Sequence, residues 1–542
     1  MRKVLFFLTG ILLTASGAMA HDFEADGIYY SFRDVVRQTV GVACRGENFQ
    51  DYPDEYSGRV VIPATVKYRG TTYTVEAIEK GAFGDCDGLE QVVVGDRVTS
   101  IGDAAFVFCR HLKAVELGSG VEVIGNDVFC GCEALASLEF GALVRQVGTS
   151  VFAGCVGLER VLVHDQNPYY TSHGACNALI EKASNKLIAG CKNTIIPDDV
   201  VSIAEAAFYG CSGLTSVHIP ASVADIGFEA FAKCEGIRSI EVDPRNRVYD
   251  SRQGCNAVVE TTTGRLLVGC MNTVIPDGIR SIHASAFYGC SHLAEIFIPA
   301  SVTDIGSGAF GRCAGLQKIT VAPNNLVYDS RNGCNAIIET SRDLLLVGCG
   351  GTVIPNTVSQ IGDRAFFGSK QLRQIVIPNS ITEIGESAFE DCVGLSSVVI
   401  GNGVTSIGDL AFGRCEQLAS LSIGESVASI GEYAFSACFL LKKVVIPNQV
   451  GFVGLCAFGG CESLKSVTIG SRVAYIGSGA FDRCTSLTDV VCLADNEVVI
   501  EEDVFEDVNI GAATLRVSAS ALKSYRKSDP WKNFGKIEAL TN

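Results

Sequence analysis

Twenty-three cysteines give this chain of 542 residues a large store of thiol groups. A thiol can attack a substrate, bind a metal ion or form a disulfide, and its surroundings decide which. In thirteen places a cysteine stands three residues after a phenylalanine, as in Phe106 and Cys109 or Phe389 and Cys392. Such regular placement first indicates a packing position that recurs along the chain.

The phenylalanines themselves mark a repeat. Fifteen of them run from Phe83 to Phe505 at intervals of 23 residues, apart from a final 24 and three steps of 56. One unit reads A-F-x-x-C-x-x-L-x-x-V-x-I-P-x-x-V-x-x-I-G. Its L-x-x-V-x-I part predicts a short strand, V-x-x-I-G a second extended segment, and A-F-x-x-C a tight or single-turn helical corner. The period predicts a β-rich solenoid of the leucine-rich-repeat kind, with about fifteen units and a parallel sheet.

The corner cysteines fit a structural role best. A small, readily buried residue suits the inside of a sharp corner. Parallel thiols in successive turns have the wrong geometry for disulfides, and the chain has no C-x-x-C pair of the kind that holds zinc. We therefore expect buried thiols, no metal site and no cofactor.

Each of the three longer steps adds a further block to the unit. The blocks lie near 164–197, 243–276 and 322–355, and each has two apolar runs around a polar turn, which predicts a β-hairpin. In the first block this places Glu181 opposite Lys186, Ile180 opposite Leu187, and Cys176 opposite Cys191. The same arithmetic gives three candidate disulfides, with buried thiol pairs as the alternative: Cys176–Cys191, Cys255–Cys270 and Cys334–Cys349.

The rest of the chain is assigned to export and to the two ends of the array. Residues 1–20 have a basic start, an apolar run and small residues up to Ala20, which predicts a secretory signal cleaved before His21. Residues 21–80 are expected to form a β-rich N-terminal cap, 81–510 the solenoid, and 511–542 a C-terminal cap closed by Trp531. No other apolar run approaches the length of a membrane-spanning helix.

Charge excludes one class of partner. The net charge is −17, and −19 once Arg2 and Lys3 leave with the signal. A field of this sign repels phosphate backbones and anionic headgroups, so nucleic acid is not expected to bind.

The repeated unit resembles that of the BspA-like, or Treponema-type, leucine-rich-repeat surface proteins. The likeness rests on the pattern quoted above, covers about residues 80–510, and extends to the hairpin blocks and the ending "YRKSDPWKNFGKI". The resemblance implies a protein that is secreted or held at the bacterial cell surface, where several members bind host matrix or plasma proteins or other bacteria. It implies no shared catalytic residues and no common ligand motif.

No pattern in the sequence supports catalysis. H-E-x-x-H, G-x-S-x-G and a phosphate-binding glycine loop with its lysine are all missing from the sequence. The seven histidines lie in different repeats, without ligand spacing. We expect the protein not to be an enzyme.

Binding sites in a solenoid are expected along the exposed sheet, here taken as its concave face. The fifth position of L-x-x-V-x-I points outward, and from Phe297 onward this column carries no charge. Contiguous exposed apolar surface often marks an interaction site, although valine also simply favours strands. The candidates on this face are Phe297, Val376, Val399, Val445, His218 and Glu241.

The hairpin blocks offer a second candidate surface, in the loops "YDSRQG" and "YDSRNG". Tyrosine and arginine are common contact residues, so Tyr249, Arg252, Tyr328 and Arg331 are candidates, with structured turns as the alternative. Two functions remain open. The chain is either an exported, non-catalytic protein that recognises an extracellular protein or glycan, for example as an adhesin, or a self-associating envelope scaffold without a specific ligand.

Overall fold

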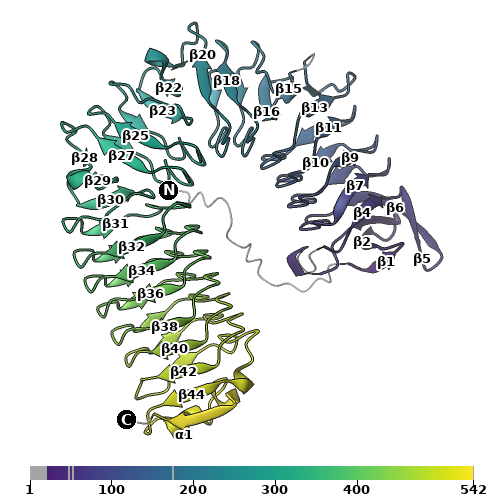
Figure 1. Cartoon of the computed structure of the whole chain (residues 1–542). Coiled ribbons are helices and arrows are strands. Elements are labelled where there is room, and N and C mark those ends of the chain that lie inside the picture. Colours follow the sequence, from purple (N-terminus) through teal and green to yellow (C-terminus); the bar gives the residue numbers. More distant parts are fainter. Residues whose placement is uncertain (1–20, 47–48, 52–53, 174–175, 541–542) are drawn as a thin grey trace. The chain divides into compact units, whose positions relative to one another are not determined.

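The computed structural model describes residues 21–46, 49–51, 54–173 and 176–540. Nearly all of its regular structure is β-strand (Figure 1). Within these residues the one α-helix is α1 (Leu522–Tyr525), close to the C-terminal end. The expected signal peptide, residues 1–20, lies outside the described residues.

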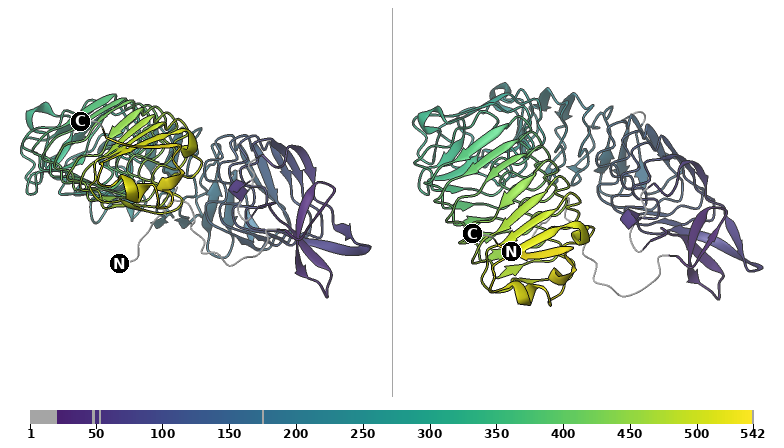
Figure 2. Two further views of the ribbon diagram at one scale, coloured as in Figure 1. Left: turned by 90° about the horizontal axis from the view of Figure 1, so that it is seen from below. Right: turned by 60° about the horizontal axis from the view of Figure 1, so that its bottom comes forward.

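The described chain divides into two compact units. Unit 1 takes in the described residues up to 195 together with 203–208, and unit 2 takes in 196–202 and the residues from 209 onward. Both are built from the same kind of turn. In unit 2 the strands of successive turns stack in rows, and the C-terminal cap follows the last turn (Figure 2).

Each turn contributes two strands, as the repeat pattern predicts. The L-x-x-V-x-I segments form one row of parallel strands: β32 (Gln374–Ile377), β34 (Ser397–Ile400) and β36 (Ser420–Ser422). The V-x-x-I-G segments form the other: β33 (Glu383–Ile384), β35 (Ser406–Ile407) and β37 (Ser429–Ile430). We call these two rows the long-strand face and the short-strand face. The predicted β-rich solenoid with a parallel sheet is confirmed.

Alternation along the long strands divides core from surface. In β32, Ile375 and Ile377 are buried, whereas Val376 between them is 64% exposed. Successive side chains of a strand point to opposite faces, so every turn sends two apolar side chains inward and leaves the position between them outside. The buried side chains of successive turns join into a continuous core.

The corner between the strands is a tight turn, the first of the two expected forms. In the turn around Phe412, both Leu410 and Arg414 have a left-handed backbone, with φ of 56° and 59°. Phe412 stacks on Phe389 of the preceding turn, with ring centroids 4.9 Å apart and planes 2° apart. The phenylalanines thus form a ladder of stacked rings inside the solenoid.

The corner cysteine is bonded as well as buried. The Cys415 thiol donates to the backbone carbonyl of Phe389 in the preceding turn, at 3.3 Å. Cys109, Cys132 and Cys392 make the same contact to the phenylalanine 26 residues earlier, at 2.9 to 3.1 Å. Ser369 follows a hairpin block, where the residue 26 positions back is Asp343 and no such phenylalanine is available. Cys211 and Cys290 follow the other two blocks and keep the thiol, which Cys290 donates to the backbone carbonyl of Gly269.

The three blocks form antiparallel hairpins, as expected. Their strands are β15 (Ala178–Glu181) with β16 (Lys186–Gly190), β22 (Val258–Glu260) with β23 (Arg265–Val268), and β29 (Ile337–Glu339) with β30 (Leu344–Val347). Glu181 pairs with Lys186 and Ile180 with Leu187, as predicted. A register shift between Leu179 and Ile180 then changes the pairing by one residue, and the other two hairpins carry the same shift.

Both ends of the array are covered. At the N-terminal end β1 (Phe23–Ala25), β2 (Ile28–Asp34), β3 (Thr39–Val42), β5 (Thr65–Tyr68) and β6 (Thr71–Ile78) form a sheet that continues into the short-strand row. At the other end Trp531 is fully buried, stands edge-on to Phe505, and donates its Nε1–H to the carbonyl of Val498 at 3.1 Å. These segments close the apolar core of the solenoid.

Candidate functional site

The long-strand face of unit 2 carries a column of exposed apolar side chains. Four of the predicted residues lie in it: Phe297 is 50% exposed, Val376 64%, Val399 43% and Val445 47%. Phe297 belongs to β25 (Glu295–Ile298), and Val445 belongs to β38 (Lys443–Val445). The structure therefore places these four side chains on the surface, where the repeat pattern predicts them.

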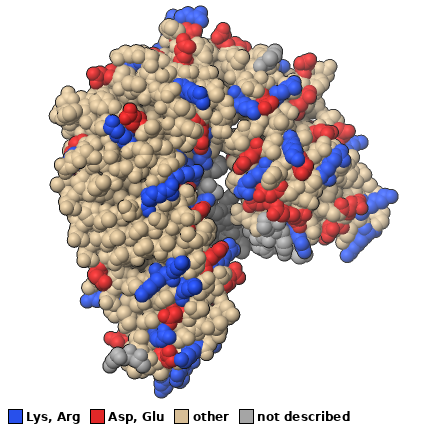
Figure 3. All heavy atoms as spheres, in the orientation of Figure 1, with Lys and Arg blue, Asp and Glu red and all other residues tan. Residues whose placement is uncertain are grey.

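Pairing fixes which members of the column are neighbours. Val376 lies beside Val399, and Val399 beside Ser422, in adjacent parallel strands. Val445 pairs with Thr468 of β40 (Ser466–Ile469), which pairs in turn with Val491 of β42 (Asp489–Cys492). The result is a stripe of valine side chains interspersed with hydroxyl groups, with no charged residue between Val376 and Val491. Figure 3 shows mainly uncharged side chains over this part of unit 2, around the strands labelled β32 and β34 in Figure 1.

Two further members of the column lie in the hairpin blocks and escaped the sequence analysis. Val274 is 70% exposed and Val353 73% exposed. Each stands 23 residues before a predicted residue, Phe297 and Val376 respectively. The interval of 23 residues could have identified both positions. They lie at the end of each hairpin block, after the second hairpin strand, where the sequence pattern predicted no further strand.

Phe297 borders an open groove. A cavity of about 420 Å³ lies between the hairpin tail from Met271 to Ile275 and the strands β25 and β27 (Lys318–Val321). Val274 and Phe297 supply its apolar lining, while Glu295 and Lys318 form an ion pair at its edge, 3.2 Å apart. The groove could therefore accommodate an apolar side chain of a partner, with charged groups at its edge.

His218 and Glu241 form a separate, polar part of the same face. They are exposed neighbours in the parallel pair β18 (Ser216–Ile219) and β20 (Ser239–Val242). Among the described strands this pair forms its own two-stranded sheet, distinct from that of Phe297. The six candidates of this face therefore do not form one cluster.

The tyrosines proposed for the hairpin loops are not on the surface. Tyr249 and Tyr328 are each only 5% exposed. They lie in the strands β21 (Tyr249–Asp250) and β28 (Tyr328–Asp329), which pair with β22 and β29. The prediction that the two tyrosines are surface contact residues was wrong. The residues around them are polar, as in a loop, although the segment forms a strand.

The two arginines of those loops are partly exposed but committed to neighbouring aspartates. Arg252 donates from Nε and Nη2 to the carboxylate of Asp250, at 2.8 and 2.7 Å. Arg331 binds Asp329 in the same way and also reaches Asp343 at 2.7 Å. Side-chain hydrogen bonds to Asp329 raise the pKa of Arg331 further, so its charge is held in place. This geometry corresponds to the structured turn that the sequence left as the alternative.

The hairpin cysteines do not stand directly opposite each other. The register shift brings Ala178 opposite Gly190, so that Cys191 falls out of line with Cys176. Cys255, Cys270, Cys334 and Cys349 are free thiols in the structure. The Cys270 thiol instead donates to the carbonyl of Asn256 at 3.4 Å, and the thiol of Cys349 binds Asn335 in the same way. The one-residue offset corrects the predicted pairing, while the disulfides themselves stay a prediction.

The corner thiols are expected to be poorly reactive, because burial raises their pKa. Burial raises the pKa of Cys313 and of Cys392 to about 12, and that of Cys86 to about 11. A thiol with such a pKa carries almost no thiolate near neutral pH, and thiolate is the nucleophilic form. In the described residues no group of three or more His, Cys, Asp or Glu side chains is arranged to hold a metal ion. The corner cysteines are thus placed for packing.

None of the helices among the described residues has the length and apolar character needed to cross a membrane.

Comparison with known families gives a match to the BspA type leucine rich repeat region, in six copies over residues 67–173, 181–255, 269–334, 350–465 and 405–526. None of the curated proteins matches this chain.

Several solved structures resemble it. A leucine rich cell surface protein of Faecalibacterium prausnitzii is 23% identical, over 88% of this chain and 95% of its own, with a TM-score of 0.36. A leucine-rich repeat protein of Bacteroides ovatus is also 23% identical, over 96% of this chain and all of its own, with a TM-score of 0.35. The pneumococcal vaccine antigen PcpA is 16% identical, over 97% and 100% of the two chains, with a TM-score of 0.36.

Proposed function

The chain belongs to the BspA-type leucine-rich-repeat family, and on that basis we propose that it is an exported, non-catalytic recognition protein that binds an extracellular protein. The carrying observation is the uncharged column on the long-strand face of unit 2. Val353, Val376, Val399 and Val445 are each more than 40% exposed. Contiguous exposed apolar surface of this kind is typical of interaction sites.

The chemistry of the column favours a protein partner over a glycan on this face. Apolar side chains gain from removal from water, at about 25 cal/mol per Å² buried. Between them stand Thr320, Ser422 and Thr468, whose hydroxyl groups offer hydrogen bonds. A partner segment with apolar side chains at matching intervals would use both, with Phe297 as the anchoring aromatic residue.

The test is a binding assay with the chain from residue 21 onward, against matrix proteins, plasma proteins and mucin glycans. We expect saturable binding of at least one protein. Val376→Lys combined with Val399→Lys places two charges in the column and should weaken that binding at least tenfold, because burying unpaired charge is unfavourable. Phe297→Asp tests the groove in the same way, after circular dichroism has confirmed folding.

Glu383→Lys is the matched control. Glu383 is exposed in the same turn as Val376 but lies on the short-strand face. Binding that survives all column variants would move the site elsewhere. Binding to glycans alone would contradict a protein partner, and oligomers dispersed by the column variants would identify a second copy of this chain as the occupant.

Export and adhesion form part of the same proposal and need their own measurement. Cell fractionation of the source bacterium, with N-terminal sequencing of the mature chain, is expected to find the protein outside the cytoplasm, beginning at His21. Recovery of the full-length chain from the cytoplasm would contradict the proposed export.

A further inference from the structure

A second cavity in unit 2 lies where the second hairpin block interrupts the short-strand face. It measures about 280 Å³ and lies between residues 224–232 on one side and the hairpin with β24 (Ser281–Ile282) on the other. β19 (Asp225–Ile226) and β24 belong to different sheets, because the hairpin is inserted between them. The cavity is therefore a gap in the stack, just below the roughly 300–1,000 Å³ usual for ligand pockets.

One end of the cavity has a cation with spare hydrogen-bonding capacity. Arg265 Nη2 lies 3.6 Å from Glu260 Oε2, too long for a hydrogen bond. The guanidinium of Arg265 makes no hydrogen bond within the described part of the chain, and its Nε is buried without a partner. This arrangement contrasts with Arg252 and Arg331, whose guanidinium groups are held by aspartates. A buried donor without an acceptor is costly, so a ligand oxygen here would be favourable.

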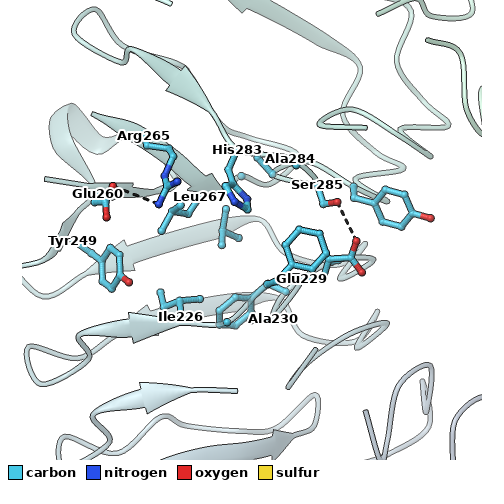
Figure 4. Close-up of a pocket in the computed structure, with 18 of the residues that line it drawn as sticks. Ile226, Glu229, Ala230, Tyr249, Glu260, Arg265, Leu267, His283, Ala284 and Ser285 are labelled. Atoms are coloured by element: carbon cyan, nitrogen blue, oxygen red, sulfur yellow. Dashed lines mark hydrogen bonds and ion pairs between the residues drawn. The ribbon is translucent and has the colours of Figure 1, made fainter. Parts of the chain in front are cut away.

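The middle of the cavity combines an aromatic ring with a neutral imidazole. Burial, assisted by the nearby Arg265, lowers the pKa of His283. One ring nitrogen is hydrogen-bonded to the backbone of Ala284, so the neutral ring offers a ligand its other nitrogen as an acceptor. Phe228 stands edge-on to it at 6.0 Å. Figure 4 shows His283 between the Arg265–Glu260 end and the Glu229–Ser285 end.

The other end offers a carboxylate acceptor. Ser285 Oγ donates to Glu229 Oε1 at 3.0 Å, in the lining of the same cavity. Across the whole cavity one cation, Arg265, is set against three carboxylates, Asp225, Glu229 and Glu260. This balance disfavours an anionic ligand and favours a neutral one that can both donate and accept hydrogen bonds.

Comparison of the three hairpin blocks shows that the polar residues lining this cavity are not needed to form the hairpin. The three hairpin blocks recur at equal intervals along the chain, so each position of one block has two internal equivalents. Where the second block has Phe228, Glu229, Arg265 and His283, the third has Ser307, Gly308, Leu344 and Gly362. The first has Thr149, Ser150, Lys186 and Ala204. The same hairpin forms in all three, so packing of the hairpin does not account for the polar set of the second.

We propose that this cavity binds a single neutral sugar residue, with Arg265 and Glu260 on its hydroxyl groups at one end, Glu229 at the other, and its ring against Phe228 and His283. Vicinal hydroxyl groups donate and accept at once, which suits a cavity with unused guanidinium donors, carboxylates and a neutral imidazole. The site is separate from the exposed column on the long-strand face and does not depend on the function proposed for it.

The test uses methyl glycosides of glucose, galactose, mannose and N-acetylglucosamine, titrated against the chain from residue 21 onward. Binding is read from saturation-transfer NMR of the sugar and from the imidazole signal of His283, assigned with a His283→Ala variant. At least one glycoside should bind, and Arg265→Leu should weaken it at least tenfold. Leucine and alanine are the residues of the equivalent positions in the third and first blocks, so both variants are compatible with the hairpin fold.

Lys186→Leu, the matching change in the first block, and Val376→Lys are the controls and should leave sugar binding unchanged. The proposal is overturned if no glycoside of the panel shifts the His283 signal, or if binding is unchanged in Arg265→Leu and His283→Ala alike. Binding of methyl glucuronide in preference to the neutral glycosides would also overturn it, since the site would then be selective for anions.

Discussion

The thiol at each corner is the smallest feature that repeats along the chain, and it contributes to stability in two ways. Cys415 fills a fully buried position and donates to the carbonyl of Phe389. We expect Cys415→Ala to lower the free energy of unfolding by about 1–2 kcal/mol, because it removes both a hydrogen bond and buried volume. Urea unfolding followed by circular dichroism measures this loss. Cys456→Ala is the control, since Cys456 is partly exposed and does not stand three residues after a ladder phenylalanine, and it should change stability by less than about 0.5 kcal/mol.

The same burial predicts how stability depends on pH. In the unfolded chain the thiols ionise near their usual pKa of 9.0, whereas in the folded chain that of Cys392 is raised to about 12. Between these values the folded state holds protons that the unfolded state has lost, so stability falls as pH rises. The loss approaches about 1.4 kcal/mol per pH unit for each such thiol. Urea midpoints at pH 8.0, 9.0 and 9.5 should decline steeply, and a flat profile would contradict buried, protonated corner thiols.

Single residues also show where sequence reasoning reached its limit. The outward position of Phe297 follows from alternation alone, so it could be predicted. Tyr249 could not, because Asp250 and Arg252 beside it have the composition of a loop, while its backbone pairs with Glu260 in a strand. The spare hydrogen-bonding capacity of Arg265 depends on a gap between two sheets, and no local pattern in the sequence records such a gap.

At the scale of the strand, neighbouring residues of β32 have different roles: the buried ones stabilise the fold, and the exposed one is available for binding. Ile375→Ala removes a buried side chain and should destabilise the turn by about 2–5 kcal/mol. Val376→Ala, one residue along in β32, should change stability by less than about 0.5 kcal/mol while weakening partner binding. Hydrogen exchange of the amides in β32 and β34 measures the first effect locally, which suits a stack whose turns contact only their neighbours. Equal losses of protection in both variants would contradict the assignment of Val376 to the surface.

The hairpins illustrate a different limit on prediction. The polar turn fixes the first two pairs, Glu181 with Lys186 and Ile180 with Leu187, as expected. In the second block β23 must also run parallel to β24, and its pairing with β22 shifts between Val258 and Val259. Because β23 pairs with both β22 and β24, the turn alone does not determine the register of the hairpin. For that reason the opposition of the cysteines was off by one residue although the strands were correct.

At the scale of the whole chain, the single tryptophan reports on the C-terminal cap. Trp531 is fully buried against Phe505, the last phenylalanine of the ladder, and Phe534 of the cap. Trp531→Ala should cost about 3–5 kcal/mol locally and expose the end of the core. We expect this variant to form oligomers in size-exclusion chromatography with light scattering, whereas exposed Lys523→Ala should stay as the parent protein. A monomeric, equally stable Trp531→Ala protein would contradict the capping role.

The regular interval between the hairpin blocks has a consequence for inheritance. Because the blocks are evenly spaced, two turns and one hairpin together form a module whose ends match. Unequal crossing-over between two such modules in the gene would delete or duplicate one whole module in frame, and every strand would still meet a partner in register. The lineage can therefore lengthen or shorten this array in steps of one module, and replace the residues of one cavity while its sister modules preserve the fold.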